Sequence, residues 1–288
     1  MLLSEGNKKL QDHLTKIGRS KETIRSYIHH NQVFGRYLDQ KNNGPTFLED
    51  VKTEDIEEYQ HMLNVKKNYK PASINLSLNA IRSLYKLAVR KNWVSKNPAA
   101  DVDPMRIQRK ERDFLDEEEI QQLVNRIDHP IIKLIVRTLA YTGLRISECL
   151  HLTLEDVDLV NNVIHVRAGK GNKDRLVPIA QSLIPYLAEY LKDYRPNILS
   201  NSFFATEKTG AVSAVYVNRV LKETCEELGW TKHVTCHVLR HSFASLLVSK
   251  GTQIPTLASL LGHADYRTVT SIYVHTKTEQ LAEAVNQL

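Results

Sequence analysis

The second half of the sequence contains histidine and arginine residues that could bind an anion. It also contains two tyrosines, and either could act as a nucleophile towards the bound anion. His237 and Arg240 lie three residues apart at the start of a predicted helix, where backbone N–H groups and a guanidinium favour an anion. Arg145 follows a Thr-Gly pair at a predicted junction between two helices. In GHADYRTVTSIYVH, residues 262–275, each tyrosine could be a packing residue or a nucleophile. Each signal is weak alone, since histidines often pack and arginines often form surface ion pairs.

The sequence does not predict a metal site. His233, His237 and His241 are evenly spaced, but His233 precedes the predicted N-cap Thr235, so the three would not share one helical face. The turn GKGNKD resembles a phosphate-binding loop but lacks the P-loop spacing. The cysteines have no close CxxC spacing and are expected to be reduced, buried thiols: Cys149, Cys225 and Cys236. We therefore expect neither a metal nor any other cofactor.

The elements that must position these residues are mostly helical. Apolar residues recur at three- and four-residue spacings after Ser20 and again in PASINLSLNAIRSLYKLAVRKNW. TCHVLRHSFASLLVSKG predicts a helix with Thr235 as its N-cap and Gly251 just past its end. Its buried stripe would be Leu239, Phe243, Leu246 and Leu247. VIHV and RLVPI flank GKGNKD and predict a β-hairpin, so we expect a mainly α fold with a small β-hairpin or sheet.

Length and a linker-like segment predict two domains. The 288 residues suffice for two units of ordinary size, about 100–150 residues each. NPAADVDPMRIQRKERDF has prolines, mixed charge and no periodicity, which is typical of a linker. Asp116 and Glu119 form a D-x-x-E capping box that opens a new helical region. We expect a first domain at residues 1–104, a linker at 105–112 and a second domain at 113–288.

Composition indicates a folded protein that does not enter a membrane. Apolar residues make up 42% and charged residues 25% of the chain. The most apolar window, IIKLIVRTLAYTG, is too short to span a bilayer and contains Lys133 and Arg137. The N-terminal residues do not resemble a signal peptide. We therefore expect a cytoplasmic protein.

Basic residues are segregated in the first predicted domain. The net charge is +6, and residues 61–100 contain many lysines and arginines but no Asp or Glu. Such a face suits a polyanion, because each neutralised phosphate releases counterions, although scattered solvated lysines would give the same pattern. The candidate DNA-contacting residues are Lys66, Lys67, Asn75, Asn79, Arg82, Lys86 and Arg90.

The ensemble of polar residues, in the order R…K…HxxR…H…Y, resembles the tyrosine recombinase family, also called the phage integrase family. The motifs TGLRISE, GKGNKDRLVPI, HVLRHSFAS, LLGH and IYVH are all similar to motifs of that family. YKPASINLSLNAIRSLYKLAVRKNWVSKNPA resembles its helical, SAM-like core-binding domain, so the resemblance covers nearly the whole chain. The chain resembles both Xer-like recombinases and the integrases or resolvases of mobile elements.

The resemblance implies a catalytic set of Arg145, Lys170, His237, Arg240, His263 and Tyr273. Two arginines can hold the non-bridging oxygens of a phosphodiester without a metal ion. A tyrosine has a pKa of about 10 and needs a base or a cationic field, which His237 and the arginines would supply. Lys170 would donate a proton to the leaving 5′ oxygen. In the family the product is a 3′-phosphotyrosyl bond, which keeps the bond energy, so no ATP is implied.

Two assignments within this set rest on sequence context. Tyr273 lies in SIYVH, which matches the context of the family's nucleophile, whereas Tyr266 occupies a place where members commonly have a packing residue. The spacing between His263 and Tyr273 is one residue longer than in many members, as in some integrases of mobile elements. Lys173 could also reach the leaving group, but the motif favours Lys170.

The family further implies a two-domain DNA clamp that recombines double-stranded core sites. We expect a monomer or weak dimer in solution and a homotetramer on synapsed DNA. Thr276 and Glu279 form a capping box for a last amphipathic helix, which would either pack on its own domain or, as the family implies, dock on a neighbouring protomer.

Two alternatives remain at this stage. A type IB topoisomerase-like relaxing enzyme shares the chemistry but needs no partner protomers, and the amphipathic C-terminal helix and small helical first domain argue against it. A non-catalytic DNA-binding accessory protein would not need the full set of catalytic residues. The sequence does not indicate the DNA target, or whether the chain serves a phage, a transposon, a plasmid or chromosome resolution.

Overall fold

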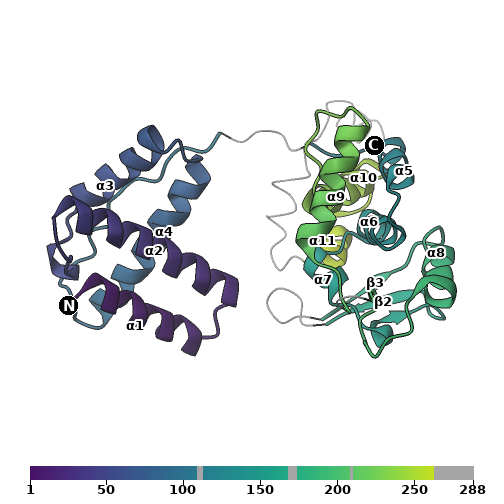
Figure 1. The fold of residues 1–288 in the computed structure, drawn as a ribbon, viewed down its shortest axis with the longest axis horizontal. Helices are drawn as coiled ribbons and strands as arrows, with labels where there is room; N and C mark the ends of the chain where they lie inside the picture. The colour runs from purple at the N-terminus through teal and green to yellow at the C-terminus, as the bar shows by residue number, and fades with distance from the viewer. Residues whose placement is uncertain (109–112, 168–173, 208–209, 263–288) are drawn as a thin grey trace, which may run out of the picture. The chain divides into compact units, whose positions relative to one another are not determined.

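The computed structural model describes residues 1–108, 113–167, 174–207 and 210–262. The chain divides into two compact units, Met1–Lys110 and Glu111–Leu288, which we describe one at a time (Figure 1). Their described parts are mostly helical, with one small sheet in the second unit. The expected fold class, mainly α with a small sheet, is therefore confirmed.

The first unit is a helical bundle. α2 packs against both α1 and α4, and it begins where predicted, because the Ser20 side chain accepts a hydrogen bond from the Thr23 backbone N–H at 3.2 Å. The helices are α1 (Leu3–Lys16), α2 (Lys21–Lys41), η1 (Leu48–Asp50), α3 (Thr53–His61), η2 (Met62–Lys66) and α4 (Pro71–Arg90). The fully buried core residues include Phe34, Leu38, Ile56, Tyr59, Ile81 and Leu84. The apolar stripe predicted for α4 forms part of this core.

The first helix of the second unit begins at the predicted capping box. The Asp116 side chain accepts from the Glu119 backbone N–H at 2.8 Å, and the Glu119 side chain accepts from the Asp116 backbone N–H at 3.1 Å. The helices described in this unit are α5 (Glu117–Arg126), α6 (Pro130–Thr142), α7 (Ile146–Leu150), η3 (Leu154–Asp156), α8 (Ile184–Glu189), η4 (Tyr190–Tyr194), α9 (Ala214–Glu227), α10 (Cys236–Ser249) and α11 (Ile254–Leu261).

The sheet of the second unit contains the predicted hairpin. β2 (Val163–Val166) pairs antiparallel with β3 (Arg175–Pro178), so that Val166 is opposite Arg175. A third strand in the described residues, β1 (Val157–Asp158), pairs with the other edge of β2. The sequence did not indicate β1, because two residues are too few to show an alternating pattern.

α10 lies in the middle of the second unit, against α6, α9 and α11 (Figure 1). Thr235 caps it as predicted and accepts a hydrogen bond from the Val238 N–H at 3.3 Å. The predicted buried stripe is only partly correct: Leu239 is fully buried, but Phe243, Leu246 and Leu247 are half-buried. Polar residues are buried instead on other sides of the helix: Arg240, His241 and Ser242. The helix is enclosed by neighbours on several sides, so a single apolar stripe does not describe it.

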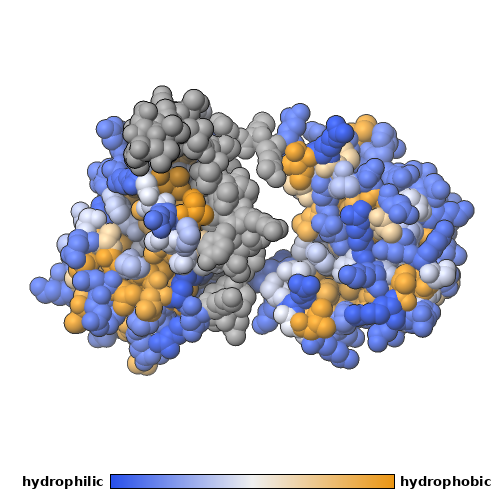
Figure 2. All heavy atoms as spheres, turned by 180° about the vertical axis from the view of Figure 1, so that it is seen from behind, coloured by the Kyte–Doolittle hydropathy of each residue, from blue (hydrophilic) through white to orange (hydrophobic). Residues whose placement is uncertain are grey.

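Polar residues dominate one face of the described residues. On the face shown in Figure 2, hydrophilic residues cover most of both units and apolar residues form small patches between them. The three cysteines are free and buried, as predicted. In the described part of the chain, no helix is long and apolar enough to cross a membrane.

Candidate active site

A left-handed glycine positions Arg145. Gly143 ends α6 with φ at +63°, a conformation that favours glycine, and a Cβ atom there would overlap the ring of Phe243. The chain therefore turns sharply and forms the predicted junction between two helices, with Arg145 as the N-cap of α7. Its side chain is 24% exposed.

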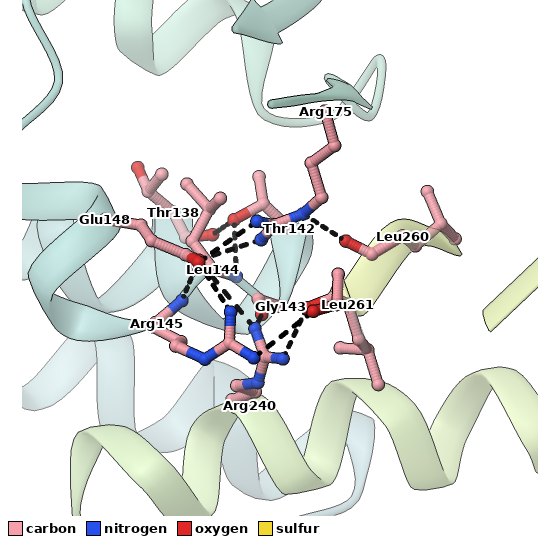
Figure 3. A network of polar contacts seen from close by, with 11 residues as sticks. Thr138, Thr142, Gly143, Leu144, Arg145, Glu148, Arg175, Arg240, Leu260 and Leu261 are labelled. Atoms are coloured by element: carbon pink, nitrogen blue, oxygen red, sulfur yellow. Dashed lines mark hydrogen bonds and ion pairs between the residues drawn. The ribbon is translucent and has the colours of Figure 1, made fainter. Parts of the chain in front are cut away.

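Glu148 lies at the centre of the candidate site (Figure 3). One of its oxygens, Oε1, accepts from Arg145 Nη1 at 2.6 Å and from Arg175 Nη1 at 3.0 Å. The other, Oε2, accepts from the Arg145 backbone N–H at 2.8 Å and from Arg175 Nη2 at 2.8 Å. Arg240 Nη1 lies 3.9 Å from the same Oε2 atom. Three guanidinium groups from different elements therefore surround one carboxylate.

The carboxylate of Glu148 is ionised in these surroundings. Burial alone would raise its pKa, but the hydrogen bonds from Arg175 and from the Arg145 backbone, together with the charge of Arg175, outweigh burial and lower the pKa to about 2. Only 7% of the side chain is exposed. An arginine and a glutamate three residues apart on a helix usually form a surface ion pair, whereas here the carboxylate is buried and shared by two arginines.

The same three arginines contact carbonyls at the C-terminal end of α11, including that of its C-cap Gly262 (Figure 3). Arg175 Nε donates to Leu260 O at 2.9 Å, and Arg240 Nη2 donates to Leu261 O at 2.6 Å. Arg145 Nη2 is 3.5 Å from the next carbonyl oxygen, that of Gly262. These carbonyls have no partners within the helix, and the helix dipole makes this end negative, so it attracts guanidinium groups.

Among the described residues, this arrangement contains more positive than negative charge. Three guanidinium groups face one carboxylate and the partial negative charge of a helix end. Arg240 is almost fully buried, with 4% of its side chain exposed, and also donates to Gly143 O at 2.6 Å. Arg145 is the most exposed of the three, and its contact with α11 is the longest. The cluster therefore suits an anionic ligand such as a phosphodiester, with Arg145 the arginine nearest to solvent.

The structure brings together part of the predicted catalytic set. Arg145 and Arg240 meet around Glu148, and His237 lies one turn before Arg240 on α10, with an exposed side chain. The remaining predicted catalytic residues and their alternatives lie outside the described residues: Lys170, Lys173, His263, Tyr266 and Tyr273. The predicted C-terminal helix also lies outside them. The roles of all these residues stay predictions.

The candidate DNA-contacting residues of the first unit fall into two groups. Five are exposed: Lys66, Lys67, Asn79, Lys86 and Arg90. Asn75 and Arg82 are half-buried and bind the chain that follows α4. The Asn75 side chain donates to Met105 O at 2.8 Å and accepts from the Met105 N–H at 2.7 Å. Arg82 donates to Ala99 O at 2.9 Å and to Val102 O at 2.5 Å. These two residues therefore have a structural role that their place among the candidate DNA-contacting residues did not indicate.

Arg175 and Gly262 are parts of the site that the sequence pattern did not single out. In a strand, residues two apart share a face, and Arg175 is two before the buried Val177. An arginine on the buried face of a predicted strand needs a buried partner, and this signal was available in RLVPI. Gly262 has φ at +65°, and a Cβ atom there would come within 2.9 Å of Arg175 Nη1.

Comparisons with known proteins identify the family of both parts of the chain. Residues 113–280 match the phage integrase family, and residues 7–95 match the phage integrase N-terminal SAM-like domain. The tyrosine recombinase of Thermosipho africanus is 31% identical over 96% of this chain and 97% of its own length. Tyrosine recombinase XerD of Staphylococcus saprophyticus is 28% identical over 94% of this chain and 93% of its own length.

Solved structures show the same fold. The Tn1549 transposon integrase in complex with circular intermediate DNA aligns over 99% of both chains with a TM-score of 0.79 and 20% identity. A lambda integrase dimer bound to a COC′ core site aligns over 96% of this chain and 97% of that chain, with a TM-score of 0.79 and 18% identity.

Proposed function

This chain belongs to the phage integrase family of tyrosine recombinases, and from that membership we propose that it cleaves and rejoins DNA at specific sites through a 3′-phosphotyrosyl intermediate. The structural observation that supports the proposal is the cluster of Arg145, Arg240 and Glu148 at the end of α11, which has the excess positive charge that a phosphodiester requires.

The proposed reaction conserves the number of phosphoester bonds. The Tyr273 oxygen attacks the phosphorus, the bond from phosphorus to the 5′ oxygen breaks, and the 5′ oxygen takes a proton from Lys170. His237 assists removal of the phenol proton, whose ordinary pKa is about 10. Arg145 and Arg240 stabilise the charge that develops on the non-bridging oxygens. Attack by the 5′-hydroxyl of another strand reverses these steps and completes strand exchange.

We propose double-stranded DNA core sites as the partner. The related Tn1549 and lambda integrase structures contain DNA, and the first unit of this chain exposes basic residues, including Lys66, Lys67 and Lys86. On synapsed DNA we expect a homotetramer, with a monomer or weak dimer in solution. Because its substrate is DNA, we expect the protein to act in the cytoplasm.

The relatives favour recombination over the two alternatives. Both curated relatives are named as tyrosine recombinases, whereas a type IB topoisomerase would relax DNA without partner protomers. An accessory protein would bind DNA and form no covalent adduct. Formation of the adduct therefore excludes the accessory protein, and strand exchange between two duplexes excludes a simple relaxing enzyme.

The test is to trap the covalent intermediate. A binding site selected by the protein from random-sequence DNA is labelled, nicked near the cleavage position and incubated with each variant. Tyr273→Phe keeps the ring but removes the nucleophilic oxygen, so DNA binding should persist while the adduct on a denaturing gel disappears. Tyr266→Phe is the matched control and should retain the adduct. Retention of the adduct by Tyr273→Phe together with its loss in Tyr266→Phe would overturn the assignment.

A further inference from the structure

Arg175 is held by protein groups on every nitrogen of its guanidinium. Two nitrogens, Nη1 and Nη2, donate one to each oxygen of Glu148, at 3.0 and 2.8 Å. The third, Nε, donates to Leu260 O at the end of α11 at 2.9 Å. Its side chain is only 10% exposed. Arg175 is therefore placed to orient other groups rather than to bind a ligand itself (Figure 3).

The site depends on the planar shape of this arginine. A guanidinium can bind a carboxylate with two parallel hydrogen bonds along one edge and a carbonyl with its Nε–H, whereas a lysine ammonium is a single point charge. The absence of a side chain at Gly262 lets the guanidinium lie close to the backbone, since a Cβ atom would be 2.9 Å from Nη1 and 3.0 Å from Cδ. The guanidinium of Arg175 can therefore occupy this position only because residue 262 is a glycine.

Arg175 and Arg145 share the two oxygens of Glu148. Because Arg175 binds both oxygens, the Arg145 side chain is joined to the carboxylate through Nη1 alone, at 2.6 Å. The other terminal nitrogen of Arg145, Nη2, points to Gly262 O at the long distance of 3.5 Å. Without Arg175, Glu148 could turn and bind both terminal nitrogens of Arg145, which would draw that guanidinium away from an incoming anion.

Arg175 also binds the helix end to which Arg240 donates. Arg240 donates to Leu261 O, and the preceding carbonyl, Leu260 O, is the one that Arg175 binds. The end of α11 is therefore anchored by two neighbouring arginines. Both arginines of the candidate phosphate site, Arg145 and Arg240, depend on groups that Arg175 orients.

We propose that Arg175 is a positioning residue for strand cleavage: it binds Glu148 and the end of α11 so that Arg145 and Arg240 are held ready for the scissile phosphate. This inference rests on the proposed function. When Arg175 is removed, Glu148 inhibits the site, because its charge then pairs with both terminal nitrogens of Arg145.

The first experiment compares two variants with a matched control. Arg175→Met removes the guanidinium, and Arg175→Lys keeps the charge in case the first variant does not fold. Arg167→Met is the control, because Arg167 belongs to the same hairpin but pairs with Asp156 at 2.6 Å, outside the site.

We measure DNA affinity and, separately, the rate of adduct formation in a single turnover on nicked DNA. Both Arg175 variants should bind DNA within about threefold of the unmodified protein and form adduct about 100-fold more slowly, the loss typical of a small misplacement of reacting groups. Arg167→Met should form adduct at the unmodified rate.

Two further measurements separate positioning from a general structural defect. A substrate with a methylphosphonate at the scissile position has lost one charged oxygen, so it needs less stabilisation from the arginines. On this substrate the rate defect of the Arg175 variants should shrink by about tenfold or more. Addition of Glu148→Gln to Arg175→Met removes the competing charge and should raise the cleavage rate above that of Arg175→Met alone. Equal defects on both substrates, or no gain in the double variant, would overturn the proposal.

The outcomes also distinguish this inference from the proposed function. If the unmodified protein forms no adduct, the proposed function fails. If it forms an adduct that disappears in Tyr273→Phe, but the Arg175 variants cleave at the unmodified rate, only the positioning role of Arg175 is wrong.

Discussion

The ionised Glu148 should make the stability of the second unit depend on pH, and we predict that Glu148→Gln reveals this dependence. The carboxylate is the shared partner of Arg145 and Arg175, and it lies 3.9 Å from Arg240. Glutamine has nearly the same shape but carries no charge, so the variant leaves three guanidinium groups close together with no carboxylate between them. The folded state should lose the energy of this ion cluster.

The size of the effect follows from the pKa of Glu148. Its folded-state pKa of about 2, compared with an ordinary 4.5, corresponds to a contribution of about 3 kcal/mol. This agrees with the cost of about 3–5 kcal/mol for breaking a buried ion pair. Because the folded-state pKa is the lower one, the contribution is complete above the ordinary pKa and decreases as the pH falls towards 2. At pH 3 we expect about 1.4 kcal/mol to remain.

Urea unfolding measures this contribution in the full chain. The protein has two tryptophans, Trp93 in the first unit and Trp230 in the second. In a Trp93→Phe background, the fluorescence of Trp230 reports the second unit alone. The matched control is Glu117→Gln, which removes an exposed ion pair with Lys250 and should cost less than about 1 kcal/mol. A loss for Glu148→Gln that is the same at pH 7 and pH 3, or no larger than that of the control, would refute this reasoning.

Three further predictions concern the turn before α7, the first unit and the C-terminal residues. Gly143→Ala forces a side chain into the left-handed region and against the ring of Phe243, so thermal unfolding should show a loss of about 2 kcal/mol or more. Gly229→Ala is the control, because Gly229 has a similar φ of +69° with open space around it, and it should lose only about 1 kcal/mol. Lys86→Ala and Arg90→Ala should each weaken DNA binding and lower the slope of log affinity against log salt concentration by about 1. An unchanged slope in a salt titration would show that these residues do not contact DNA. Deletion of residues 277–288 should leave binding to a half-site nearly intact but impair synapsis and recombination, and normal recombination by the truncated protein would contradict docking between protomers.

Local features of this chain could be predicted from its sequence because they depend on neighbouring residues. The N-caps at Ser20 and Thr235, and the capping box of Asp116 and Glu119, involve residues within three positions of each other. The hairpin of β2 and β3 is also local, with a polar turn between two β-rich runs. The order and type of the polar residues were sufficient to indicate the family and its chemistry.

Only the tertiary structure decided how the polar residues share their partners. The helical pattern of α4 does not distinguish Asn75, which binds the chain after the helix, from the exposed Lys86, because the partner of Asn75 lies 30 residues further along the sequence. Similarly, Arg175 and Glu148 are 27 residues apart, and Arg240 is 97 residues from the carbonyl of Gly143 that it binds. A carboxylate that accepts bonds from two arginines, and a helix end that binds three, form only when packing brings these segments together. The sequence therefore determined which charges the site contains, and the fold determined which of them are neutralised by one another and which remain for a ligand.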